Sequence, residues 1–169
     1  MDRSRAMKTM KSIMMEIEHQ YDGVEHKSIS EWVYTYKVGE DLPDLEVSME
    51  FKDLFIDIFI RPNPVILKEE NLVHMYRVLN FMNKYLKGSS RIYIDGELNV
   101  EISLRFTYKQ LELLEFECVP EIQFILTIYK ELIDVLRDVG LEGMHFVEAV
   151  METEFRLIEL EERGYKSRR

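Results

Sequence analysis

The stretch LEVSMEFKDLFIDIFIRPNP, residues 45–64, decides the fold class. In its first half, apolar residues at 45, 47, 49 and 51 alternate with polar ones, and this period of two predicts a strand with one buried and one wet face. The second half, Leu54 to Ile60, is almost wholly apolar and predicts a central strand that ends before Pro62, because proline cannot donate a ladder hydrogen bond. Only Lys52 and Asp53 separate the halves, so an antiparallel hairpin is expected.

Upstream of this hairpin, the sequence predicts one helix and one further strand. Residues 5–21 repeat apolar side chains at helical spacing, and Asp22-Gly23 ends that helix. Residues 24–30 are expected to be a polar connector. Residues 32–38 are rich in aromatic and β-branched residues and predict a strand whose Trp32, Tyr34 and Tyr36 belong to the core.

Downstream, a strongly apolar helix is predicted over residues 69–87, ending at Gly88. A hairpin of strands 91–95 and 97–106 follows, with Asp95-Gly96 as a two-residue type I′ turn.

The last third of the chain is predicted to be helical. A short helix or turn covers 110–118, and a longer helix covers 121–138 with Pro120 in its first turn. A final helix runs from about 144 to 162. The order αβββαββαα indicates an α+β fold with a mainly antiparallel five-stranded sheet packed on helices.

Composition sets further expectations. The length of 169 residues suits a single domain over 1–162, followed by a basic tail, 163–169, expected to be disordered. The net charge of −10 disfavours nucleic-acid binding. The single cysteine, Cys118, suits a reducing compartment, and the longest apolar run is far too short for a membrane helix. We therefore expect a cytoplasmic protein that does not bind membranes.

A family resemblance rests on LNFMNKYLKG, residues 79–88, followed by RIYIDGEL, residues 91–98. This segment resembles the bacterial YbjN-like family of sensory-transduction regulators, and the likeness covers roughly residues 28–139. The resemblance implies a type III secretion chaperone-like fold, non-enzymatic binding of protein partners and often a homodimer. The helix predicted over 144–162 is an addition to that layout.

Motifs of catalysis and cofactor binding are missing from the sequence. It has no glycine-rich phosphate loop, no GxSxG and no HExxH. His145, Glu148 and Glu152 share one predicted helix face, but no fourth metal ligand is visible, so a solvated face is the simpler interpretation. Neighbouring glutamates make Cys118 a poor nucleophile. We predict no catalytic residue, no cofactor and no metal site, and hence not an enzyme.

The candidate binding residues are Phe55, Phe59 and Tyr93. Strand alternation places their rings on the sheet face opposite the core, where they predict an aromatic patch within a polar rim. The patch is expected to be covered by the final helix, by a second subunit or by a segment of another protein.

The leading hypothesis is a non-enzymatic, protein-binding regulator or chaperone-like adaptor that docks its partner on this sheet face or on a sheet edge. The alternative is a structural homodimeric subunit of a larger assembly, motivated by the two very apolar helices. An enzyme or small-ligand binder with an unfamiliar site is the third hypothesis.

Overall fold

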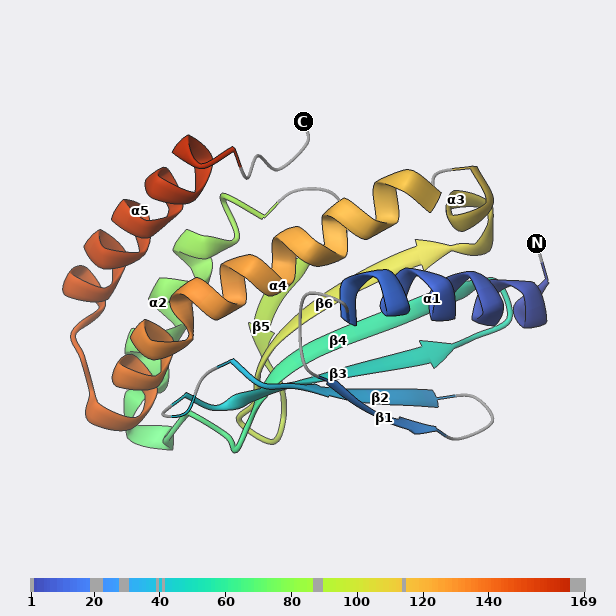
Figure 1. Ribbon diagram of the computed structural model, residues 1–169. Coiled ribbons are helices and arrows are strands. Elements are labelled where there is room, and N and C mark those ends of the chain that lie inside the picture. The colour runs from blue at the N-terminus through green and yellow to red at the C-terminus, as the bar shows by residue number, and fades with distance from the viewer. Residues whose placement is uncertain are drawn as a thin grey trace.

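An antiparallel sheet of six strands, in the order β1-β2-β3-β4-β6-β5, carries a layer of helices on one face (Figure 1). The computed structural model describes residues 2–18, 23–27, 31–38, 40, 42–86, 90–113 and 115–164. The strands are β1 (Gly23–Lys27), β2 (Glu31–Tyr36), β3 (Asp44–Phe51), β4 (Phe55–Asn63), β5 (Arg91–Ile94) and β6 (Val100–Thr107).

The helical segments are α1 (Arg3–Glu18), the 3-10 turn η1 (Glu69–Asn71), α2 (Leu72–Met82), α3 (Tyr108–Leu113), α4 (Glu115–Arg137), the π-helical turn η2 (Asp138–Glu142) and α5 (Phe146–Glu162). In Figure 1, α1 and α4 lie across the sheet, and α2 and α5 continue the same layer. None of the described helices is long and apolar enough to cross a membrane.

The α+β class and the antiparallel sheet are confirmed, and all five predicted strands are present. The sheet has one strand more, because residues 23–27, most of which belong to the predicted connector 24–30, pair antiparallel with β2 at its outer edge. The sequence of β1 shows no alternation of apolar and polar residues. An edge strand can be held by backbone hydrogen bonds to a single neighbour, so its side chains need not carry a strand pattern.

Alternation along the strands builds the core. Ile56, Ile58 and Ile60 of β4 are fully buried under the helices, and β3 and β6 turn equivalent apolar sets to the same side. The β2 residues predicted for the core, Trp32, Tyr34 and Tyr36, are buried there as well. Burial of each such side chain contributes roughly 1.5–3 kcal/mol, which makes this face the main source of stability.

β4 differs from its predicted bounds at both ends. Leu54, the first residue of the predicted strand, lies in the turn before β4 and is 74% exposed. The strand also continues past Ile60 through Pro62, which pairs with Leu45 of β3. The pairing of β4 with β6 ends at Ile60, so Pro62 has a strand neighbour on one side only and its missing donor breaks no ladder.

The β5–β6 hairpin does not use the predicted two-residue turn. Its loop contains Gly96, Glu97 and Leu98, and Leu98 takes a left-handed conformation with φ of 64° instead of starting the strand. The Asp95 carboxylate selects this longer loop, because it accepts hydrogen bonds of 2.8 Å from the backbone N–H groups of Glu97 and Asn99. These bonds and one from the Asn99 side chain outweigh the opposing effect of burial and lower the pKa of Asp95.

Two helix bounds are also corrected. α2 ends at Met82 rather than at residue 87, and turns follow it. α4 begins at Glu115, so Pro120 lies inside the helix instead of in its first turn. The predicted end of the first helix at residue 21 lies outside the described residues.

The side chain of Asn83, the C-cap residue of α2, holds the edge strand β5. Asn83 donates from Nδ2 to the carbonyl oxygen of Ile92 at 2.8 Å and accepts from the Ile92 N–H at 3.0 Å. The side-chain amide thereby fills the position that a further strand would take beside β5.

A close backbone contact fixes the turn between α4 and α5. Gly140 in η2 lies against Ile66, and its carbonyl oxygen accepts from the Lys68 N–H at 3.1 Å and from Asn71 Nδ2 at 2.9 Å. Gly143 then ends the turn in a left-handed conformation, with φ of 75°.

The final helix, α5, packs against α2 and α4 on the helical side of the molecule (Figure 1). It therefore does not cover the opposite sheet face. The final helix was one of the three possible covers considered for that face, and the other two are a second subunit and a segment of another protein. Arg163, the first residue of the predicted tail, pairs with Glu131 of α4 at 3.2 Å. Residues 165–169 of the tail lie outside the described residues.

Candidate protein-binding surfaces

The sheet face opposite the helices carries the predicted site residues Phe55, Phe59 and Tyr93. No described helix lies over this face in Figure 1. Phe55 and Phe59 are half-buried, and Tyr93 is 36% exposed. The strand registers place the three rings at different levels: Phe55 lies opposite Thr107, Phe59 opposite Ser103, and Tyr93 opposite Glu101. Polar neighbours thus separate rings that were predicted to form one patch.

A guanidinium group lies over Phe55. The Arg105 side chain holds Asp57 through two hydrogen bonds of 2.6 and 3.1 Å, and its Cζ atom lies 4.2 Å from the centre of the Phe55 ring. The two-point contact fixes the planar guanidinium over the ring. One face of Phe55 is therefore already occupied within the chain.

Phe59 lies between two hydroxyl side chains in the middle of the face. Its strand partners on either side are Ser48 and Ser103. At the neighbouring level, Arg61 binds Glu46 through hydrogen bonds of 2.9 and 2.5 Å. The surroundings of Phe59 are thus mainly polar.

Tyr93 is tied to a buried carboxylate. Its hydroxyl group donates a hydrogen bond to Glu101, which is only 6% exposed. Burial raises the pKa of Glu101 because it disfavours the charged form, although the bond from Tyr93 acts in the opposite direction. Burial and the acceptor Glu101 also raise the pKa of Tyr93.

The Glu101 site gives a pH-dependent prediction. A raised carboxyl pKa in the folded state means that the native protein holds this proton more tightly than the unfolded chain. Its contribution to stability is complete below the unfolded value of about 4.3 and is lost as the pH rises through the folded-state pKa. We expect Glu101→Gln, which keeps an acceptor for Tyr93, to raise the free energy of unfolding at pH 7 by about 0.5–1 kcal/mol.

Urea unfolding of Glu101→Gln and of the unsubstituted chain between pH 4 and pH 7 measures this effect. The difference should shrink toward pH 4. Glu97→Gln on the exposed loop of the same hairpin is the control and should behave like the unsubstituted chain at every pH. A pH-independent effect of Glu101→Gln would show that the buried charge is not its cause.

A second apolar surface lies on α5 and was not singled out from the sequence. Four large side chains at helical spacing share the outer face of this helix and are each about half to two-thirds exposed: Val147 (49%), Met151 (67%), Phe155 (59%) and Ile158 (49%). We call these four residues the outer stripe. The opposite face of α5 is buried, through Ala149, Thr153, Leu157 and Leu160.

The signal for the outer stripe is present in the sequence as two apolar sets on opposite sides of one helix. A surface helix of a folded domain needs only one such set. A helix with two is expected to be covered on both sides, and the described residues cover only one side of α5. The outer stripe contains four of the ten exposed large apolar side chains among the described residues.

The histidine and glutamates considered for a metal site lie in α5 and at its start. His145 is the N-cap residue, and its Nδ1 atom accepts from the Val147 N–H at 3.4 Å. Glu152 is engaged with Arg156 at 2.8 Å. The described residues contain no group of three or more possible ligands placed to hold a metal ion.

Comparisons with known proteins identified no relatives: no family model, no curated protein and no solved structure matches the chain.

Proposed function

We propose that this protein is a non-enzymatic regulator or chaperone-like adaptor that acts by binding another protein. The observation that carries the proposal is the outer stripe of α5, where Val147, Met151, Phe155 and Ile158 stay exposed although the other face of the same helix is buried. Contiguous exposed apolar side chains with a polar rim are typical of protein-binding surfaces. Assignment to the YbjN-like family and a cytoplasmic location remain part of this proposal.

The outer stripe is a better candidate for the docking surface than the sheet face. Phe55 is stacked under Arg105, and Tyr93 donates to Glu101, so both rings already have partners within the chain. The side chains of Met151 and Phe155 are exposed to more than half of their extent. A partner that covers them removes more apolar surface from water per residue.

A double substitution tests this function. We expect Met151→Gln with Phe155→Gln to abolish capture of the partner while changing the free energy of unfolding by less than about 0.5 kcal/mol, because exposed side chains contribute little to folding. The measurement is recovery of proteins on the tagged chain from extracts of the native host, identified by mass spectrometry, alongside urea unfolding.

Phe55→Ser with Phe59→Ser is the matched control on the sheet face. A partner that binds the outer stripe should be captured by this control as well as by the unsubstituted chain. Loss of the partner with the control but not with the Gln variant would move the docking surface to the sheet.

The second candidate, a structural homodimer, is favoured by the same exposed stripe if two copies of α5 pair. Light scattering at micromolar concentration distinguishes it. If the chain is a dimer and the Met151→Gln, Phe155→Gln variant is a monomer, the result supports the structural subunit and contradicts the adaptor.

A further inference from the structure

Glutamates border the outer stripe along its whole length. Helical spacing places Glu148, Glu152 and Glu159 on one side of the stripe and Glu154 and Glu161 on the other. All of these except the half-buried Glu152 are exposed. The surface around the apolar side chains is therefore negatively charged on both sides.

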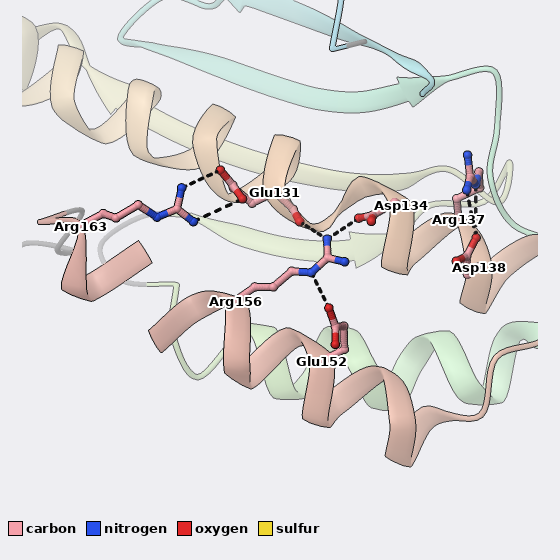
Figure 2. Close-up of polar contacts among 7 residues, drawn as sticks. All are labelled: Glu131, Asp134, Arg137, Asp138, Glu152, Arg156 and Arg163. Atoms are coloured by element: carbon pink, nitrogen blue, oxygen red, sulfur yellow. Dashed lines mark hydrogen bonds and ion pairs between the residues drawn. The ribbon is translucent and has the colours of Figure 1, made fainter. Parts of the chain in front are cut away.

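The basic residues Arg156 of α5 and Arg163 at its C-cap point to α4, and of the rim glutamates they neutralise Glu152 but not the exposed ones (Figure 2). Arg156 Nη1 contacts Asp134 Oδ1 and the Glu131 carbonyl oxygen, both at 2.6 Å, and its Nε binds Glu152 at 2.8 Å. Arg163 pairs with the Glu131 carboxylate at 3.2 Å. The hydrogen bond from Arg156 lowers the pKa of Asp134 against the effect of burial, which keeps this carboxylate charged.

An acidic groove runs beside the stripe, between the end of α4 and the first half of α5. Its volume is about 690 Å³. Its apolar lining includes Val135, Met144 and Met151, and its charged lining consists of Asp134, Asp138, Glu148, Glu152 and Arg156. Arg156 pairs with Asp134 and Glu152, and Asp138 pairs with Arg137, whereas Glu148 is exposed. A lysine or arginine side chain fits these surroundings, because its aliphatic stem can lie on the apolar lining while its charged end meets the Glu148 carboxylate.

The same charges oppose a second copy of the chain on this surface. If two α5 helices paired through their outer stripes, glutamates on each rim would face glutamates of the other copy. Opposed like charges cost free energy, whereas a rim of opposite charge adds both attraction and faster encounter.

From these observations we propose that the partner element is a basic amphipathic helix, which lies along α5 with its apolar side on the outer stripe and its lysines or arginines against the glutamate rims and in the groove. This inference rests on the function proposed above and adds the chemistry of the partner. It corresponds to the docking of an amphipathic helix on an apolar surface through anchors at helical spacing.

Two synthetic peptides test the proposal with the full chain. Both are about 18 residues long, or five helical turns. Both carry leucines at the spacing i, i+3, i+4, i+7, continued along the peptide, so that one face is apolar. One has lysine and the other has glutamine at the remaining positions. In fluorescence anisotropy at about 0.15 M salt, we expect the lysine peptide to bind at least about tenfold more tightly.

Substitutions on α5 separate specific docking from general attraction to an acidic protein. Glu148→Gln with Glu154→Gln removes one acid from each rim and should weaken binding of the lysine peptide about fivefold. Glu40→Gln with Glu97→Gln makes the same change in net charge in exposed loops of the sheet and should have little effect. Met151→Gln with Phe155→Gln should weaken binding at least about tenfold.

Four results would overturn the proposal. The first is equal weakening of binding by the two pairs of glutamate substitutions, and the second is equal affinity for the two peptides. The third is sedimentation of the chain with phosphatidylcholine or phosphatidylglycerol vesicles that depends on Met151 and Phe155. The fourth is self-association of the chain that depends on the same two residues. Equal affinity for the peptides, combined with capture of a host protein that requires Met151 and Phe155, would refute the basic helix alone. Capture that does not require these residues would instead refute the docking surface itself.

Discussion

Replacing Gly140 with alanine is expected to lower the free energy of unfolding by about 3 kcal/mol or more. A Cβ atom at this position would lie 1.9 Å from the carbonyl oxygen of Ile66 and 3.2 Å from Cα of Leu67. The contact is with backbone, so no side-chain rotation can relieve it. The Gly140 carbonyl also accepts from Lys68 and Asn71, which holds the two segments at this distance.

Gly96→Ala is the matched control, because a Cβ atom added there meets nothing within 4 Å. Urea unfolding of both variants should show a large loss for Gly140→Ala and little change for Gly96→Ala. Similar values for the two would mean that the close contact with Ile66 relaxes at small cost.

The second large effect is expected at Asn83. Asn83→Ala removes both hydrogen bonds to the backbone of Ile92 and should cost about 2 kcal/mol of unfolding free energy, because it leaves a strand donor and a strand acceptor without that partner. Asn80→Ala on the exposed side of α2 is the control, and alanine's helix propensity makes a neutral or slightly stabilising result the expectation.

Asn83→Asp refines the test. The carboxylate still accepts from the Ile92 N–H but places an acceptor against the Ile92 carbonyl oxygen. Stability at pH 7 should therefore be no higher than that of Asn83→Ala. Full stability of Asn83→Asp would show that the bond to the carbonyl oxygen contributes nothing.

The parts of the fold that were predicted correctly are those whose signal repeats along the chain. Alternation in β3 and β6 and the apolar run in β4 were sufficient to predict the strands, their buried faces and an antiparallel sheet. β1 was missed because backbone pairing to β2 places it, and such pairing leaves no apolar pattern. The hairpin loop was wrong because the Asp95 carboxylate, rather than the Asp-Gly pair alone, determines its length.

For the candidate surfaces, the sequence predicted which face a side chain lies on but not which other residues contact it. Alternation correctly placed Phe55, Phe59 and Tyr93 on the face opposite the core. It could not reveal that Arg105, fifty residues away from Phe55 in sequence, lies over that ring. On α5 both apolar faces are visible in the sequence. Which of them is buried depends on how the helix docks on α2 and α4, and this follows only from the assembled structure.

The amide of Asn83 has a further consequence for how this protein behaves at high concentration. Polymerisation of sheets into fibrils requires the outward N–H and C=O groups of an edge strand to be available to an incoming chain. On β5 these groups at Ile92 are already bonded within the molecule. A neighbouring molecule therefore cannot use these two groups to extend the sheet, so Asn83 opposes the addition of a strand at Ile92 as well as stabilising the hairpin.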